Sequence, residues 1–110
     1  MIAPFLAALL VAAAPAPARL QVSADEFSFA LSRTAVKQGA AIVELVNFGE
    51  DPHDLRLRRT GGTRTLRLRT VAPGRRGVLE ATLAPGTWQL WCSLGDHRAR
   101  GMRATLVVRR

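Results

Sequence analysis

The residues with the clearest capacity for chemistry are few and differ in type. After Met1, the 110-residue sequence contains one Cys, two His and one further Met, namely Cys92, His53, His97 and Met102. Three of them lie in one short run that begins at Cys92 and ends at Met102, whereas His53 lies well upstream. Two imidazoles, one thiolate and one weak thioether form the ligand set of a copper centre that transfers electrons. The sequence therefore predicts one mononuclear copper site built from all four residues.

Each of these residues also has an ordinary structural explanation. Cys92 could be an inert buried thiol, because Cys is among the most buried residue types, and Met102 could fill the core. His53 could be a loop histidine with no ligand role. The close spacing of Cys92, His97 and Met102, with no other soft donor left over, favours the metal site.

The segments that must position these residues have the periodicity of strands, and none shows a sustained helical period. Short strands are predicted at residues 27–32, 40–46, 55–59, 64–69, 77–83, 87–92 and 104–109. Pro73-Gly74 and Pro85-Gly86 predict turns between them. Several short strands separated by turns indicate an all-β fold, either a small sandwich or a barrel.

One pair of these strands allows a prediction of register. Residues 55–59 and 64–69 both alternate apolar with basic side chains, and Thr60-Gly61-Gly62-Thr63 between them predicts a two-residue hairpin turn. In that hairpin Leu57 faces Leu66, Leu55 faces Leu68, and Arg56 faces Arg67. The two Arg side chains must then separate into solvent, because like charges opposite each other are unfavourable.

The N-terminal residues have the pattern of an export signal. Residues 5–14 are continuously apolar, and Ala16-Pro17-Ala18 supplies small residues for signal peptidase. We therefore predict a signal peptide at residues 1–18 and one copper-binding domain at residues 19–110, located in the periplasm or outside the cell. The alternative is an uncleaved apolar arm. Residues 2–14 are too few to span a bilayer comfortably, so no stable membrane insertion is expected.

The net charge of +8 comes from fifteen Arg and one Lys against eight acidic residues. Such a field speeds encounter with acidic partners and makes that encounter sensitive to salt. Nucleic acid is the usual partner of so basic a chain, but no nucleic-acid motif is recognisable and none is predicted to bind. The alternative is that the Arg residues are simply the solvated outer faces of strands.

The sequence resembles the cupredoxin family, the small blue copper proteins, in two places. One is the Asn-x-Gly stretch that begins at Asn47 and leads to His53, Asp54 and an apolar residue; the other is the final Cys-loop-His-loop-Met run. The resemblance implies a Greek-key β-sandwich of about seven to eight short strands. It also implies one copper ion held by His53, Cys92, His97 and Met102, and one-electron transfer without enzymatic activity.

Two further residues are predicted to support the ligands. Asn47 would bridge the two ligand loops through its side chain, and the backbone N–H near Asp54 would donate to the sulfur of Cys92. The alternative for Asp54 is that it caps the turn after Pro52 or pairs with Arg69, which faces it in the predicted hairpin register.

The resemblance further implies that electrons leave through His97. Leu94 would contribute to a small apolar patch around its edge, and Arg98, Arg100 and Arg103 would surround this patch with positive charge. We therefore predict a monomer that meets redox proteins that are acidic around their redox centre.

Two other functions are compatible with the same residues. A copper chaperone or scavenger could use the same scaffold, although such sites usually expose more Met and His than this chain has. An enzyme with Cys92 as nucleophile and His97 as base is a third possibility, but no other feature of the sequence supports it. The prediction is an electron carrier that is not an enzyme.

Overall fold

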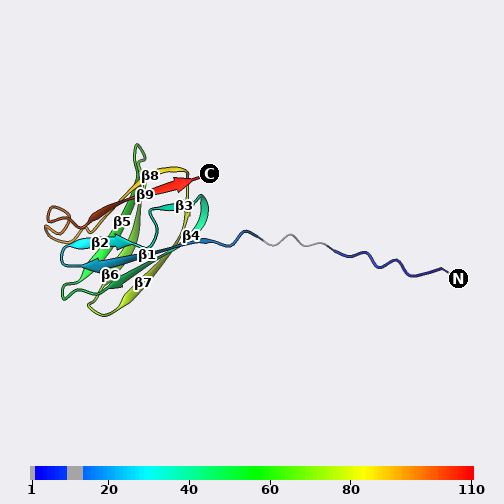
Figure 1. Cartoon of the computed structure of the whole chain (residues 1–110), viewed down its shortest axis with the longest axis horizontal. Helices are drawn as coiled ribbons and strands as arrows, with labels where there is room; N and C mark the ends of the chain where they lie inside the picture. The colour runs from blue at the N-terminus through cyan, green and yellow to red at the C-terminus, as the bar shows by residue number, and fades with distance from the viewer. Residues whose placement is uncertain (1, 10–13) are drawn as a thin grey trace.

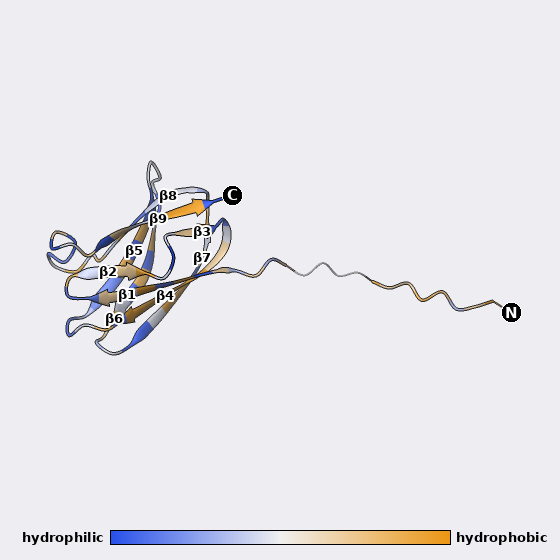
Figure 2. Cartoon of the chain, viewed as in Figure 1, coloured by the Kyte–Doolittle hydropathy of each residue, from blue (hydrophilic) through white to orange (hydrophobic). Residues whose placement is uncertain are grey.

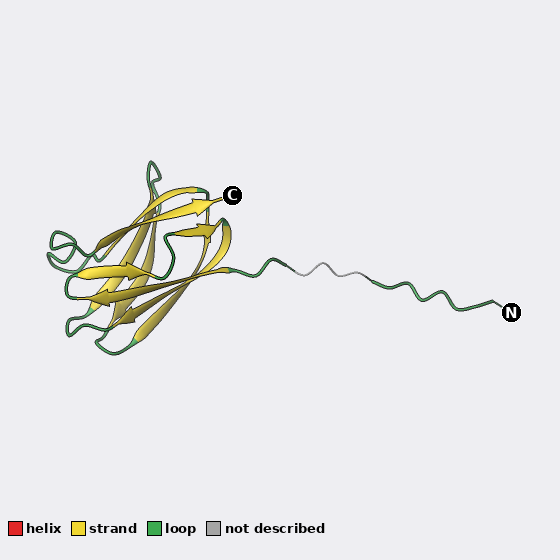
Figure 3. Ribbon diagram, viewed as in Figure 1, coloured by secondary structure: helices red, strands yellow, loops and turns green. Residues whose placement is uncertain are grey.

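The computed structural model of the chain describes residues 2–9 and 14–110 (Figure 1). These residues form nine strands, and Figure 3 colours them as strands and loops. The strands are β1 (Ala18–Asp25), β2 (Ser28–Leu31), β3 (Ala35–Lys37), β4 (Gly39–Asn47), β5 (His53–Arg59), β6 (Thr65–Val71), β7 (Arg76–Leu83), β8 (Gly86–Trp91) and β9 (Arg103–Arg109). The predicted all-β class is therefore confirmed.

The strands form two sheets that face each other as a sandwich. One sheet has the order β2-β1-β4-β7, and the other has the order β3-β9-β8-β5-β6. Most connections pass from one sheet to the other, and β1 runs parallel to β4. This is the predicted Greek-key sandwich. Buried aliphatic side chains from both sheets form one core, and Figure 2 shows apolar and polar residues in the same strands.

All seven predicted strands are present, and the two additional ones are β1 and β3. In β1 the buried residues are Leu20, Val22 and Ala24, which is the alternation expected of a strand with one face on the core. β3 has three residues and pairs with the edge of β9. Neither was predicted, because β1 begins inside the predicted export signal and β3 is too short to show a period.

The predicted hairpin register between β5 and β6 is confirmed: Leu57 pairs with Leu66, Leu55 with Leu68 and Arg56 with Arg67. The predicted turn is wrong. Pairing stops before the two glycines, and the N–H of Gly62 donates to the carbonyl of Arg59 at 2.8 Å. The turn therefore consists of residues 59–62 and centres on residues 60–61. Its third residue is Gly61, whose φ of 80° lies in the left-handed region that glycine adopts without strain.

Of the N-terminal segment, the described residues 2–9 and 14–17 lie outside both sheets, and β1 begins at Ala18 (Figure 1). Ile2, Leu6 and Leu9 are almost fully exposed. Residues 1 and 10–13 of the predicted export signal lie outside the described residues, so the boundary between residues 18 and 19 stays a prediction. Among the described residues, no helix has the length and apolar character needed to cross a membrane.

Candidate metal centre

The loop that carries three of the predicted ligands is closed by its own backbone. Cys92 directly follows β8 and Met102 directly precedes β9, and these strands are antiparallel neighbours. The N–H of Cys92 donates to the carbonyl of Met102 at 3.1 Å, and the N–H of Met102 donates to the carbonyl of His97 at 3.1 Å. Gly95 and Gly101 have φ of 48° and 120°, so both turn the chain where another residue would be strained.

Folding brings His53 to this loop from the start of β5. Its Nδ1 lies 3.3 Å from Nδ1 of His97, which in turn lies 3.6 Å from Sγ of Cys92. One donor atom from each of the three residues lies within 4.8 Å of the other two. Donors bound about 2.0–2.3 Å from one ion in a trigonal plane are roughly 3.5–4 Å apart. The three donors therefore have the separation that a shared metal ion requires.

The chemistry of the donors identifies the ion that fits. A thiolate and two imidazoles in a trigonal arrangement, with room for one weak axial ligand, suit copper in both of its common oxidation states. Among the described residues, His53, Cys92 and His97 are the one cluster of His, Cys and acidic side chains with such spacing. The three residues form a site for one copper ion.

Met102 is fully buried in the same core cluster as Cys92. The Met102 backbone makes hydrogen bonds with the backbones of Cys92 and His97, so Met102 is fixed beside these two residues. Ligation by its sulfur stays a prediction.

Burial controls the protonation of the donors. Cys92 and His53 are both fully buried. Burial raises the pKa of the Cys92 thiol, and the backbone N–H groups of Asp54 and Leu94 partly oppose this by donating to the sulfur. Burial also lowers the pKa of His53, so its imidazole is neutral and able to ligate. Metal binding at neutral pH must therefore displace the thiol proton.

The Asp54 backbone opposes the rise in the pKa of Cys92, which agrees in direction with the predicted donation to the sulfur, and the Asp54 side chain makes a separate link. Its carboxylate accepts the N–H of Ser93 at 2.7 Å and the Ser93 hydroxyl, and it lies 3.4 Å from Nη2 of Arg56. The alternative pairing with Arg69 is wrong, because the β5–β6 register shifts between His53 and Leu55 and moves Asp54 out of line with Arg69. Asp54 therefore ties the start of β5 to the residue after Cys92.

Asn47 has a different role from the predicted one. Its Nδ2 donates to the carbonyls of Asp51 at 2.7 Å and Val71 at 3.0 Å, and its Oδ1 accepts the N–H of Gly49 at 2.8 Å. These contacts brace the upstream ligand loop against β6. The link between the two ligand loops is made by Asp54 instead.

Two residues beside the site were not predicted. The carboxylate of Glu26 accepts the backbone N–H groups of Glu50 and Asp51, and the Asp51 contact is the main reason that its pKa is lowered. The ring of Phe27 lies 4.9 Å from the ring of His97. Both residues lie in the turn between β1 and β2, and no pattern in the sequence connects that turn to the ligands.

The predicted contact residues lie on the ligand loop or directly after it. The His97 side chain is 14% exposed, Leu94 is half-buried, and Arg98, Arg100 and Arg103 are exposed. The Arg98 guanidinium lies 4.5 Å from the centre of the Trp91 ring. Arg100 lies over Phe27 and pairs with Asp96 at 2.8 Å, which neutralises part of its charge.

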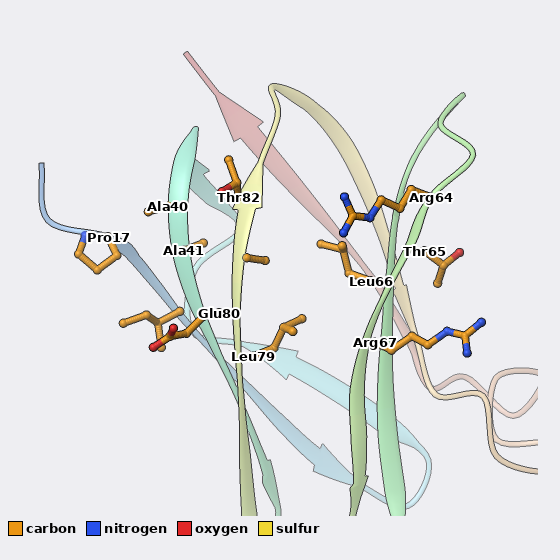
Figure 4. A pocket seen from close by; sticks show the side chains of 12 residues that line it. Pro17, Ala40, Ala41, Arg64, Thr65, Leu66, Arg67, Leu79, Glu80 and Thr82 are labelled. Carbon is orange, nitrogen blue, oxygen red and sulfur yellow. The ribbon is translucent and has the colours of Figure 1, made fainter.

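A hollow between β4, β6 and β7 lies away from these residues (Figure 4). Its walls combine apolar side chains such as Ile42, Leu66 and Leu79 with charged ones such as Arg67 and Glu80. It contains none of the predicted site residues, so the metal cluster remains the candidate functional site.

Comparison with known proteins supports the fold. No protein-family model and no curated protein matches the chain in sequence. An auracyanin from Roseiflexus castenholzii superimposes with a TM-score of 0.66 at 16% identity, over 87% of this chain and 100% of the auracyanin. Auracyanin A from Chloroflexus aurantiacus, a "blue" copper protein, has a TM-score of 0.69 at 14% identity, over 84% of this chain and 99% of its own.

A multicopper oxidase also matches, with a TM-score of 0.60 at 16% identity over 86% of this chain, but the match spans only 45% of the oxidase. The chain therefore has the cupredoxin fold, and the predicted resemblance is confirmed at the level of architecture. Within that fold, His53, Cys92 and His97 have the geometry of a type 1 copper site.

Proposed function

We propose that the chain is an exported mononuclear blue copper protein that carries single electrons between redox partners. The observation that carries this proposal is the convergence of His53 on Cys92 and His97, with the two Nδ1 atoms 3.3 Å apart. When bound, copper supplies a one-electron couple between Cu(II) and Cu(I). His53, Cys92 and His97 would hold the ion and Met102 would be the axial ligand. The strands β5, β8 and β9 fix the ends of both ligand segments, so the donors stay in place in both oxidation states.

The burial of the donors favours a carrier over the other two functions. Cys92 and His53 are fully buried, and the edge of His97 is the part of the cluster that reaches solvent. An electron can pass through that edge, whereas a substrate cannot reach the thiol. A chaperone or scavenger would need donors that an incoming copper complex can reach, and the same burial argues against it.

Copper titration tests the proposed function. One equivalent of Cu(II) added to residues 19–110 is expected to give an intense blue colour from thiolate-to-copper charge transfer and a reversible one-electron couple. Because the Cys92 pKa is raised, about one proton should be released per copper at neutral pH, which a weakly buffered solution with a pH indicator would report. Tight Cu(I) binding without a coloured Cu(II) form would instead favour a copper-handling protein.

The charge of the two sheets supports an acidic partner. Strands of the five-stranded sheet contain one acidic residue, Asp54, and eight basic ones: Lys37, Arg56, Arg58, Arg59, Arg67, Arg69, Arg103 and Arg109. Strands of the other sheet contain two Arg and three acidic residues. One row of paired residues crosses four strands of the five-stranded sheet from β6 to β9. It consists of Arg67, Arg56, Trp91 and Arg103, and the Arg98 guanidinium lies over its Trp91. A monomer would therefore present this sheet and the His97 edge to a redox protein with acidic residues around its centre.

Salt dependence tests the electrostatic part. Raising the ionic strength from about 0.01 M to about 0.15 M shortens the Debye length from roughly 30 Å to roughly 8 Å. Electron exchange with an acidic redox protein should then slow about tenfold, as measured by stopped-flow absorbance. Arg103→Gln should reduce the rate at low salt more than Arg19→Gln, which removes the same charge from the other sheet. A rate that is flat or rises with salt would contradict an acidic partner.

A further inference from the structure

The buried histidine ligand has one nitrogen without a hydrogen-bond partner. His53 is fully buried, and its Nε2 is the one buried side-chain nitrogen or oxygen among the described residues that makes no hydrogen bond. An unpartnered buried polar atom is costly, so natural structures rarely keep one without a reason. The carboxylate oxygen Oε1 of Glu26 lies 3.6 Å from this nitrogen.

The Glu26 carboxylate is held in this position by the upstream ligand loop. Its Oε1 accepts the N–H of Glu50 at 2.6 Å and the N–H of Asp51. On the other side, a Cβ added to Gly49 would overlap Oε2, so the carboxylate rests directly on the glycine backbone. The Glu26 side chain is 25% exposed. It is therefore fixed between His53 and residues 49–51.

The tautomer of a metal-bound His53 explains the arrangement. A neutral imidazole has one N–H, and the nitrogen that ligates a metal is the one without it. Nδ1 of His53 faces Nδ1 of His97 inside the metal cluster. Ligation through Nδ1 therefore leaves the proton on Nε2, the nitrogen that lies 3.6 Å from Glu26 Oε1. This separation is longer than a normal hydrogen bond, so the two groups must move slightly closer for the carboxylate to accept the proton.

We propose that Glu26 is the positioning residue for His53: its carboxylate accepts the Nε2–H and so orients the ring, and its charge favours Cu(II) over Cu(I) at the site. The inference rests on the proposed copper function. A carboxylate behind a ligating histidine fixes the ring and makes it a more basic ligand. A negative charge near the metal also stabilises its more positive state. Both effects lower the reduction potential.

Glu26→Gln and Glu50→Gln form a matched test. Both remove one negative charge, but Glu26 is the carboxylate that lies beside His53, whereas the Glu50 side chain is exposed. In Glu26→Gln the ratio of Cu(II) to Cu(I) affinity should fall about tenfold, which raises the potential by ~59 mV for one electron. In Glu50→Gln the rise should be less than half as large. Protein-film or redox-titration voltammetry of the copper-loaded proteins measures both. Equal shifts, or no shift in Glu26→Gln, would overturn the proposal.

Gly49→Ala tests position without changing charge. Its added Cβ must displace the Glu26 carboxylate, so the potential should rise as in Glu26→Gln. ¹⁵N NMR of the diamagnetic Cu(I) protein provides a second readout: a slowly exchanging His53 Nε2–H is expected in the wild type and should be lost in Gly49→Ala, which displaces the acceptor, whereas the amide oxygen of Glu26→Gln can still accept it.

These measurements separate the two hypotheses. If the wild type forms no blue Cu(II) species, the proposed function fails. If the wild type is blue and reversible but Gly49→Ala and Glu26→Gln both keep its potential, only the role of Glu26 fails.

Discussion

Cys92→Ser is expected to abolish the intense visible absorption of the copper-loaded protein. The band depends on charge transfer from a thiolate to Cu(II), and Cys92 is the one Cys in the chain. Copper affinity should fall at least about 100-fold, since even the loss of an outer partner of a metal ligand costs 10–100-fold. Absorbance during Cu(II) titration measures both effects, and circular dichroism checks that the sandwich still forms.

Met102→Leu is the control for this experiment. Leu has a similar volume, so the buried position should remain filled, and the thiolate and both imidazoles stay in place. The blue colour should persist while the potential rises by ~59 mV or more, a tenfold change in relative affinity. An unchanged spectrum and potential would show that Met102 is not a ligand. A Cys92→Ser protein that remained blue would refute the site as a whole.

Asp54→Ala is expected to cause a large loss of stability. Asp54 is 2% exposed and accepts two hydrogen bonds from Ser93 while pairing with Arg56. Its removal leaves a backbone N–H, a hydroxyl and a half-buried guanidinium without their partner. The free energy of unfolding of the metal-free protein should fall by about 2–4 kcal/mol. Urea denaturation followed by tryptophan fluorescence measures it.

Asp96→Ala is the matched control, because Asp96 is an exposed acid on the ligand loop whose recorded ion pair is with Arg100. Its loss should change stability far less, as is usual for surface pairs. Asp54→Asn should fall between the two, since the amide oxygen can still accept the Ser93 N–H. If Asp54→Ala and Asp96→Ala had equal free energies of unfolding, the link between β5 and the ligand loop would not contribute to stability.

Much of the fold was predictable because one face of most strands is buried. The Leu residues of β5 and β6 are on the core face, and a shift by one residue would expose them, so their pattern determines the register. The turn was predicted less well because pairing ends at Arg58 and Thr65, before the glycines. The strands β1 and β3 were missed for a different reason: β1 begins inside the predicted export signal, and β3 has only three residues.

The candidate donors were predictable because the chain has so few soft side chains. Their surroundings were not. Glu26 reaches His53 only through tertiary folding, and a lone Glu in a turn has no distinguishing pattern. The role expected of Asn47 also changed, because its side-chain amide is used within the upstream loop and at β6. The pairing considered between Asp54 and Arg69 is absent because a bulge after His53 shifts the register. Single-residue shifts of this kind depend on packing and have no signature in local sequence.

The unequal charge of the two sheets makes the molecule an electric dipole. An external field exerts a torque on a dipole, so a molecule of this kind rotates while it is still separated from an oppositely charged surface. The basic sheet would turn toward that surface before the first contact, and fewer collisions would be lost to wrong orientations. A change in the distribution of Arg residues therefore changes the rate at which the protein and its redox partner reach the orientation for electron transfer. The metal ligands stay the same.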